Sequence, residues 1–162
     1  MGLAVRRYDR WADERWAEAF LDAHLGGRRQ ARRGELVDVL EPGLGLIAGE
    51  GLGLLTYRFD GDAIELSAIA TSPRGRGTGT ALVGALVALT RVRALSRIWV
   101  VTTNDNLDAL AFYQRRGFRL TELRVGAVDE ARRTIKPEIP LIGEHGLGLH
   151  DEIELAVVVD PG

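Results

Sequence analysis

The stretch Arg74-Gly75-Arg76-Gly77-Thr78-Gly79 places three glycines between a strand-like run and a long helix-like run. Glycine has no Cβ and tolerates positive φ, so a ligand can approach such a backbone closely. The first N–H groups of the following helix have no intrahelical partner and carry the positive end of the helix dipole, which suits a phosphate or pyrophosphate. Arg74 and Arg76 add positive charge. A plain glycine-rich turn that lets a strand pack on a helix is the other interpretation, and this stretch alone leaves both open.

Two nucleotide-binding motifs do not fit this stretch. A P-loop ends in Gly-Lys-Ser/Thr, whereas Gly79 is followed by Thr80 and Ala81. A Rossmann fingerprint has the spacing G-x-G-x-x-G, whereas Gly75-x-Gly77-x-Gly79 has a shorter second gap. The stretch therefore fits neither motif well, although Gly79 and Gly84 leave the Rossmann spacing ambiguous.

The composition is that of a soluble globular protein. The chain has 162 residues, of which 46% are hydrophobic and 27% charged, and we expect residues 1–162 to form one domain. The net charge of −2 gives no reason to expect a nucleic-acid partner. The absence of cysteine excludes disulfides, thiolate-bound zinc and a cysteine nucleophile. No apolar run has the length of a signal or membrane segment, so we expect a cytoplasmic protein without a membrane partner.

Hydrophobic periodicity and capping residues predict a mixed α/β order of elements. Asp9 and Asn106 are suited to cap helices, Gly26-Gly27 and Gly117 to end them, and Asp60-Gly61-Asp62 to form a tight turn. The predicted helices are 9–25, 77–95, which we expect to be well buried, 107–116 and 127–135. The predicted strands are 3–8, either 36–40 or preferably 44–49, 52–59, 63–71, 97–103, 118–125 and 153–159. This order predicts a mixed sheet with helices on both faces.

A second motif brings a family resemblance. The segment Asn106-Leu107-Asp108-Ala109-Leu110-Ala111-Phe112-Tyr113-Gln114-Arg115-Arg116-Gly117-Phe118 resembles the N-x-x-A-x-x-F-Y-x-x-x-G-F segment of the GNAT N-acetyltransferases. Arg74-x-x-Gly77-x-Gly79 likewise resembles the acyl-CoA loop of that family, R/Q-x-x-G-x-G/A. The two motifs occur in the family's order, and the resemblance covers residues 63–125 well.

The resemblance implies a GNAT fold with a central mixed sheet of six to seven strands, in which the fourth and fifth strands splay apart around acetyl-CoA. Strand 63–71 would pair its last residues with the pantetheine arm, and the glycine loop would hold the pyrophosphate. The family pattern also implies that Asn106 faces the pantetheine or caps its helix, that Phe112 lines the cleft, and that Arg115 or Arg116 reaches the adenosine phosphates. The implied acetyl-CoA residues are Ile69, Ala70, Thr71, Arg74, Gly75, Arg76, Gly77, Thr78, Gly79, Thr80, Asn106, Ala109, Phe112, Tyr113 and Arg115.

The catalytic candidates are Tyr113 and Glu65. Tyr113 resembles the family's general acid, which donates a proton or a hydrogen bond to the departing CoA thiolate; a buried packing aromatic is the alternative. Glu65 is the sole ionisable side chain in the apolar strand 63–71, where it is expected to share a face with Ser67 and Ile69. Burial would raise its pKa and suit it as the base that deprotonates the amine. The alternative is a structural Glu that pairs with an arginine.

Three further segments have open roles. Arg28, Arg29, Arg32 and Arg33 fit a solvated helix face, or a patch that steers an acidic substrate or the CoA 3′-phosphate. The loop 136–152 is long enough to be a substrate-facing lid. His145, His150, Asp151 and Glu152 lie in or beside it, but their spacing fits no metal template, so no metal site is predicted.

The sequence thus predicts an acetyl-CoA-dependent N-acetyltransferase. A small molecule or peptide with a primary amine would attack directly in a ternary complex, since there is no cysteine to carry the acetyl group. Apolar strand 153–159 would allow a homodimer. The alternatives are a non-catalytic acyl-CoA-binding or regulatory module on the same fold and, more remotely, a nucleotide-binding protein.

Overall fold

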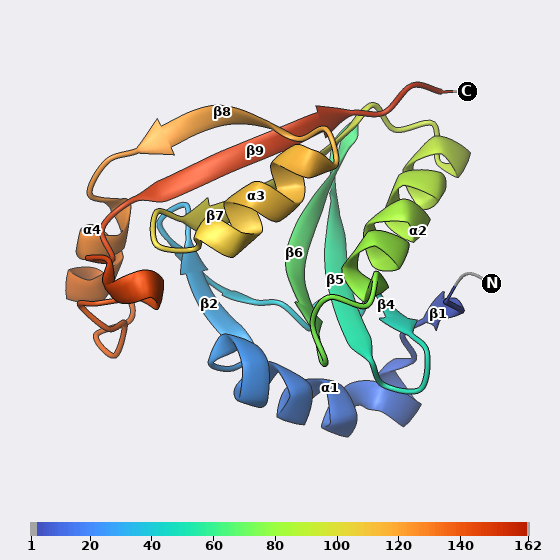
Figure 1. The fold of residues 1–162 in the computed structure, drawn as a ribbon, viewed down its shortest axis with the longest axis horizontal. Helices are drawn as coiled ribbons and strands as arrows, with labels where there is room; N and C mark the ends of the chain where they lie inside the picture. The colour runs from blue at the N-terminus through green and yellow to red at the C-terminus, as the bar shows by residue number, and fades with distance from the viewer. Residues whose placement is uncertain (1–2, 162) are drawn as a thin grey trace. The chain divides into compact units, whose positions relative to one another are not determined.

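The structure is a computed structural model that describes residues 3–161, coloured from the N-terminus to the C-terminus in Figure 1. It contains two compact units. The first comprises the chain up to Arg29, Asp38–Ile98 and the chain from Val158; the second comprises Gln30–Val37 and Trp99–Val157. Each unit is described by itself. The prediction of a single domain over residues 1–162 stays a prediction.

The first unit contains antiparallel strands in the order β1-β4-β5-β6. Gly61, with φ 59°, lies in the tight turn between β5 and β6, as predicted. Both candidates for the second strand prove to be strands, because 44–49 contains β4 and 36–40 overlaps a strand of the second unit. The strands are β1 (Val5–Arg7), β4 (Gly45–Ala48), β5 (Gly53–Asp60) and β6 (Ala63–Thr71).

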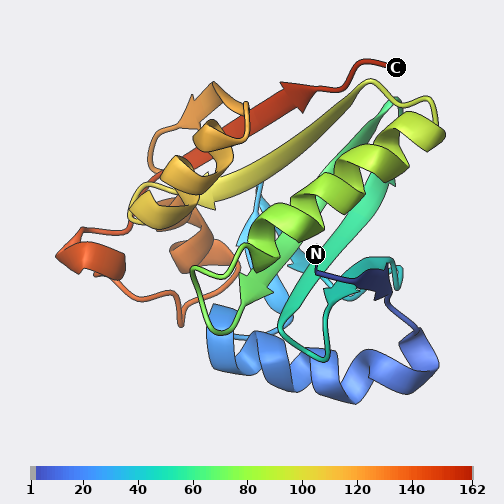
Figure 2. The ribbon, with the colours of Figure 1, turned by 45° about the vertical axis from the view of Figure 1, so that its right-hand side comes forward.

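Helices α1 (Arg10–Leu25) and α2 (Thr78–Val92) cover opposite faces of these strands. Asp9 caps α1 as predicted, since its carboxylate accepts hydrogen bonds from the N–H groups of Trp11 and Ala12. Phe20 and Leu21 of α1 belong to the core cluster that includes residues of β5 and β6. Helix α2 runs along β5 and β6 (Figure 2).

The helix predicted at 77–95 is well buried on its inner face, as expected, but it is exposed at its C-terminal end. The structured helix ends at Val92, whose side chain is 82% exposed, whereas Leu82 and Leu86 on the inner face are fully buried. The apolar residues of this segment extend beyond the stripe that the sheet covers, so periodicity overestimated its buried width.

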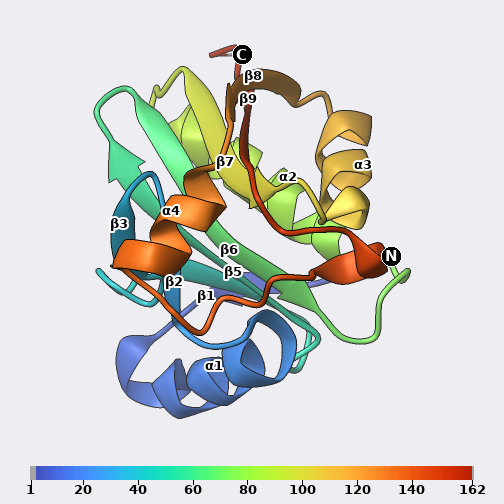
Figure 3. The same cartoon turned by 90° about the vertical axis from the view of Figure 1, so that its left-hand side faces the viewer.

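The second unit has strands in the order β7-β9-β8 and a separate two-stranded hairpin. Figure 3 shows β8 and β9 side by side, with α4 in the chain between them. Its elements are the hairpin β2 (Arg29–Arg32) and β3 (Glu35–Asp38), β7 (Arg97–Thr103), which starts at the end of the first unit, α3 (Leu107–Arg115), β8 (Arg119–Arg124), α4 (Ala127–Thr134), the 3₁₀ turn η1 (Glu144–Gly146) and β9 (Glu152–Val158).

The prediction of a solvated helix face for the arginine run is wrong, because this run forms β2 and the start of the hairpin turn. Arg33 has φ 52°, its backbone N–H donates to the carboxylate of Glu152, and its guanidinium lies 4.5 Å from the centre of the Trp99 ring. Arg32 is 6% exposed. Long-range partners, rather than local periodicity, determine this segment. Its alternative role in substrate steering stays a prediction.

The fold class is confirmed. Among residues 3–161, seven strands form the mixed main sheet and helices flank it, within the predicted range of six to seven strands. The predicted splay concerns β6 and β7, which belong to different units, and it stays a prediction. None of the helices in this part of the chain is long and apolar enough to cross a membrane.

Candidate active site

The glycine loop joins β6 to α2 in the first unit. Gly75 and Gly77 have φ of 81° and 75°, in the left-handed region that favours glycine, and a Cβ at either position would meet open space. The N–H groups of Gly75, Arg76 and Gly77 have no hydrogen-bond partner within residues 3–161. No side chain caps α2, and no acidic residue lies in its first turn. This arrangement leaves backbone donors and a helix dipole available to an anion.

Close packing from β5 supports the start of α2. A Cβ at Gly53 would lie 2.7 Å from the methyl group of Thr78 and 3.0 Å from Leu82. Thr78 is 3% exposed and Gly79 is buried as well, and the predicted contacts of both with acetyl-CoA stay predictions. Sequence reasoning assigned Gly53 no role, and only the close approach of strand and helix reveals one.

The last residues of β6 pair with β5 along one edge. Ile69, Ala70 and Thr71 lie opposite Leu55, Leu54 and Gly53, respectively. The predicted pairing of these three residues with a pantetheine arm needs their other edge, and it stays a prediction. Their backbone is extended, as such a pairing requires.

Glu65 lies in the same strand, is 1% exposed and forms an ion pair with Arg58, its direct neighbour on β5. The prediction that it shares a face with Ile69 is wrong. The register passes from Ala68 to Leu66 and so places Ser67 in a β-bulge, which inverts the alternation of the strand. Glu65 therefore points toward the α1 face, together with Ala68, whereas Ile69 points toward the α2 face. The ion pair agrees with the structural alternative for Glu65, and the role as a base stays a proposal.

The second motif forms α3 in the second unit. The Asn106 side chain accepts a hydrogen bond of 3.1 Å from the N–H of Ala109 and so caps the helix, one of its two predicted roles. Gly117, with φ 88°, ends the helix as predicted, and the N–H of Phe118 bonds to the carbonyl of Tyr113. The cap engages the Ala109 N–H, and the predicted contact of Ala109 with acetyl-CoA stays a prediction.

Aromatic and cationic groups cluster on α3. The Arg116 guanidinium lies 3.6 Å from the centre of the Phe112 ring and donates to the Phe112 carbonyl. Phe112 is half-buried and packs edge-on against Tyr113 at 5.4 Å. Arg115 is exposed. Arg116 therefore holds Phe112, and the predicted phosphate contact of Arg115 or Arg116 stays a prediction.

Tyr113 is the buried residue of α3, with 4% of its surface exposed, and its ring packs 5.3 Å from that of Phe118. Burial raises the pKa of its phenol above the ordinary value, and the nearby positive charge of Arg32 opposes this shift only in part. The phenol therefore stays protonated at neutral pH and can donate a hydrogen bond. Arg32 was missed as a neighbour of Tyr113 because the β2–β3 hairpin was not foreseen.

The loop 136–150 is held by side chains on several sides. Arg132 donates to the carbonyls of Ile139, Pro140 and Leu149. The amide of Asn104 donates to Gly148 and accepts from the N–H groups of His150 and Asp151. These contacts describe a fixed loop, and the predicted lid function stays a prediction.

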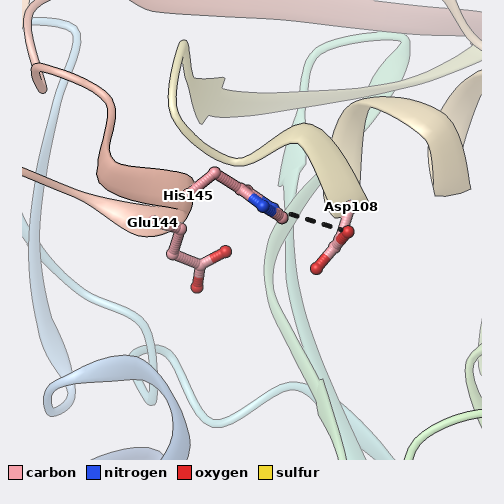
Figure 4. A group of neighbouring side chains, drawn as sticks. All are labelled: Asp108, Glu144 and His145. Atoms are coloured by element: carbon pink, nitrogen blue, oxygen red, sulfur yellow. Dashed lines mark ion pairs between the residues drawn. The ribbon is translucent and has the colours of Figure 1, made fainter.

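The four polar residues in and beside this loop have separate partners. His150 pairs with Asp129, Asp151 accepts from the N–H of Gly126, and Glu152 pairs with Arg124. A different group, Asp108, Glu144 and His145, comes together instead (Figure 4). Its ligand atoms lie within 4.8 Å of one another, and His145 Nε2 lies 3.6 Å from Asp108 Oδ1. All three side chains are exposed, and a solvated ion pair accounts for their approach.

The chain matches a known protein family and a known relative. The model of the acetyltransferase (GNAT) family matches residues 5–118, which is most of the chain. The chain belongs to the GNAT family. The protein YxbD of Bacillus subtilis (strain 168) is 38% identical over 140 residues, covering 85% of this chain and 87% of its own length.

Solved structures of the same fold are similar over nearly their whole length. An acetyltransferase of Bacillus subtilis in complex with CoA has a TM-score of 0.76 at 19% identity, and the match covers 98% of this chain and 100% of that one. A GNAT family acetyltransferase of Elizabethkingia anophelis with acetyl-CoA bound has a TM-score of 0.74 at 19% identity, covering 96% and 97%. At these identities the likeness shows the fold.

Proposed function

We propose that this GNAT protein transfers an acetyl group from acetyl-CoA to a primary amine of a small molecule or peptide. The observation that carries the proposal is the start of α2, where no side chain caps the helix. The N–H groups of Gly75, Arg76 and Gly77 in front of it have no partner in the described part of the chain. A pyrophosphate is the chemical group that fits these donors. The CoA and acetyl-CoA bound to the two structural neighbours support the same co-substrate here.

In this proposal, the glycine loop binds the pyrophosphate through its backbone. The extended backbone of Ile69, Ala70 and Thr71 orients the pantetheine arm, and Phe112 packs beside it. Arg74, Arg76 and Arg115 are exposed and carry positive charge toward the phosphates. The remaining proposed residues contribute backbone or helix geometry: Thr78, Gly79, Thr80, Asn106 and Ala109.

Tyr113 donates a hydrogen bond to the sulfur as the thiolate departs, and Glu65 takes the proton that the amine must lose before it attacks. The amine attacks the acetyl carbonyl directly, because the chain has no cysteine to form an acetyl-enzyme. A cytoplasmic location and a homodimer complete the proposal. Leu120 and Leu123 on β8, 53% and 59% exposed, support an apolar contact for a dimer.

The variant Tyr113→Phe tests the proposed acid. We expect CoA release with an active amine to slow by about 10- to 100-fold, while acetyl-CoA affinity measured by calorimetric titration is unchanged. Because the pKa of the phenol is raised, Tyr113 stays protonated across the working range, and the loss should be the same at every pH tested. Tyr57→Phe, which alters another buried tyrosine, is the matched control. Full activity of Tyr113→Phe would reduce Tyr113 to a packing residue.

The second candidate function is a non-catalytic acyl-CoA-binding module. The ion pair between Glu65 and Arg58 favours it, since a structurally engaged carboxylate is a less accessible base. Titration with acetyl-CoA followed by an amine panel separates the two functions. Binding with CoA release supports the transferase, binding without release on any amine supports the module, and binding of ATP or NAD in place of acetyl-CoA contradicts both.

A further inference from the structure

The first unit contains a cavity that the proposed acetyl transfer does not use. Its volume is about 330 Å³, at the lower end of the range for small-molecule pockets. Helix α1, strands β1 and β4 and the turn between β4 and β5 line it, and all of them belong to the first unit. The lining residues are Arg6, Asp13, Trp16, Ile47, Gly49, Glu50 and Gly51. None of them is among the residues proposed above to bind acetyl-CoA or to catalyse the transfer.

Arg6 and Asp13 neutralise each other in this lining. Hydrogen bonds of 2.8 and 2.9 Å join the guanidinium to both carboxylate oxygens, and Asp13 also accepts from the N–H of Asp9. The fork of the Arg6 guanidinium is therefore occupied, and the cavity offers an anion no bidentate partner. The charge of the buried Asp13 is balanced in the same way, so this pair gives the cavity neither sign of charge.

Glu50 provides the charge that is not balanced. It lies in the turn between β4 and β5, its side chain is exposed, and it forms no hydrogen bond or ion pair within residues 3–161. The lining as a whole is therefore negative at neutral pH. Because an exposed carboxylate alone is ordinary, the groups beside it determine what kind of cation it can hold.

Trp16 gives the cavity an aromatic wall. Phe20 of the core cluster packs on it with ring centres 4.9 Å apart and holds the ring in place. Gly51, with φ 77°, brings the turn close to the indole, where a Cβ would lie 3.1 Å from the ring nitrogen. Indole is the aromatic side chain that attracts a cation most strongly. An indole and an unbalanced carboxylate thus line the same cavity, and Ile47 adds apolar surface.

We propose that this cavity binds an organic cation with a methylated ammonium group, held between the Trp16 ring and the Glu50 carboxylate. A primary ammonium has three N–H donors to satisfy. Asp13 already accepts three hydrogen bonds, which leaves Glu50 as the carboxylate available among the described lining residues. Methyl groups need no acceptor and pack on an aromatic wall. The inference does not depend on the proposed function, because a quaternary nitrogen has no electron pair with which to attack an acetyl group.

The test follows the indole N–H signals in nuclear magnetic resonance spectra while a ligand is added at constant ionic strength. The chain has three tryptophans, and the signal lost in Trp16→Phe identifies Trp16. We expect choline to shift the Trp16 signal to saturation and to leave those of Trp11 and Trp99 in place. Ethanolamine, which lacks the methyl groups, should bind about threefold more weakly, and the neutral analogue of choline with carbon in place of nitrogen about tenfold more weakly.

Two variants separate the cavity from charge in general. Glu50→Gln and Glu35→Gln each remove one exposed carboxylate that forms no ion pair in the described part of the chain, but Glu35 lies on β3 in the second unit. Choline affinity should fall about fivefold in Glu50→Gln and stay unchanged in Glu35→Gln. Because both side chains are exposed, both variants should melt at the temperature of the wild type.

Several outcomes would overturn the inference. No saturable shift of the Trp16 signal would show that the cavity takes no such cation. Equal binding of choline and its neutral analogue would show an apolar pocket that does not select charge, and tighter binding of ethanolamine would show a site for hydrogen-bonding amines. Unchanged choline affinity in Glu50→Gln would remove the carboxylate from the site. The proposed acetyl transfer is tested separately by CoA release, so either proposal can fail without the other.

Discussion

Two glycine-containing loops of this protein differ in whether their backbone groups have hydrogen-bond partners. In the loop between β6 and α2, the N–H groups of Gly75 and Gly77 find no hydrogen-bond partner among residues 3–161, and the space beside both glycines is open. The loop 136–150 is anchored through its backbone: Arg132 binds three of its carbonyls, and Asp105 accepts from the Glu144 N–H.

The glycines themselves differ in the same way. A Cβ at Gly143 would lie 2.1 Å from the carboxylate and 2.9 Å from the Cβ of the buried Asp105, so Gly143 is required by packing. One at Gly148 would lie 2.5 Å from the ring of His150, an exposed side chain that can move aside. Gly75 and Gly77 are favoured by their positive φ, and a Cβ added at either would meet nothing within 4 Å. Glycine content alone therefore does not distinguish a binding loop from a structural one, whereas the partners of the backbone groups do.

The largest effect is expected from Gly143→Ala. The new methyl group would collide with Asp105, a buried carboxylate that also accepts from Thr103, and relieving the clash would break the bond to Glu144. We expect the free energy of unfolding to fall by about 2–3 kcal/mol. Urea unfolding measures it.

Gly146→Ala is the matched control in the same loop. Gly146 has φ 68° and open space beside it, so the substitution introduces only backbone strain of about 1 kcal/mol. Equal losses in the two variants would contradict the view that Gly143 is required by packing.

Gly77→Ala addresses the open loop. Its Cβ meets no protein atom, so the loss of stability should be only the strain of a left-handed alanine, about 1 kcal/mol. If the loop binds the pyrophosphate as proposed, acetyl-CoA affinity should nevertheless fall about tenfold, equivalent to about 1.4 kcal/mol, because the methyl group would occupy open space beside the backbone donors. Calorimetric titration measures this.

Gly61→Ala is the control for backbone strain. Gly61 has φ 59° and open space beside it, and it lies in the turn between β5 and β6. Its variant should lose similar stability and keep its affinity. Unchanged affinity in Gly77→Ala as well would mean that this loop is a plain turn.

Much of the fold could be predicted from the sequence, because the residues that mark the ends of a helix or the run of a strand lie close together in the chain. Asn106 and Gly117 bound α3 through contacts within a few residues, and strand 97–103 matches β7. The β2–β3 hairpin could not be predicted, since Arg33 takes its geometry from Glu152 and Trp99, more than sixty positions away. Charged residues in a short run give no periodicity that would reveal such partners.

The sequence indicates which residues are candidates for the site, but it does not indicate how their side chains are arranged. The Ser67 bulge shows the limit, because one added residue reverses which face Glu65 occupies, and no residue type in β6 marks it. Gly53 was missed for a similar reason, since the approach of α2 to β5 is a tertiary property.

The smallest effect is expected from Asp129→Asn in the anchored loop. Hydrogen bonds from His150 and Arg132 lower the pKa of the Asp129 carboxyl. A lowered pKa in the folded state means that the ionised form contributes stability above the unfolded value of about 4, and that this contribution is lost as the pH falls through the folded value. The wild type should therefore exceed Asp129→Asn slightly in stability at pH 7, and the two should converge toward pH 3.

Urea unfolding from pH 3 to pH 7 measures this difference, and Glu130→Gln provides the control on the same helix. Glu130 pairs with Arg133 inside α4 and makes no contact with the loop, so a simple loss of negative charge would affect both variants alike. A pH-dependent gap for Asp129→Asn alone would assign the effect to the anchor at His150. Parallel curves for the two variants would show that Arg132 and Asn104 hold the loop without this ion pair, and that its backbone bonds suffice.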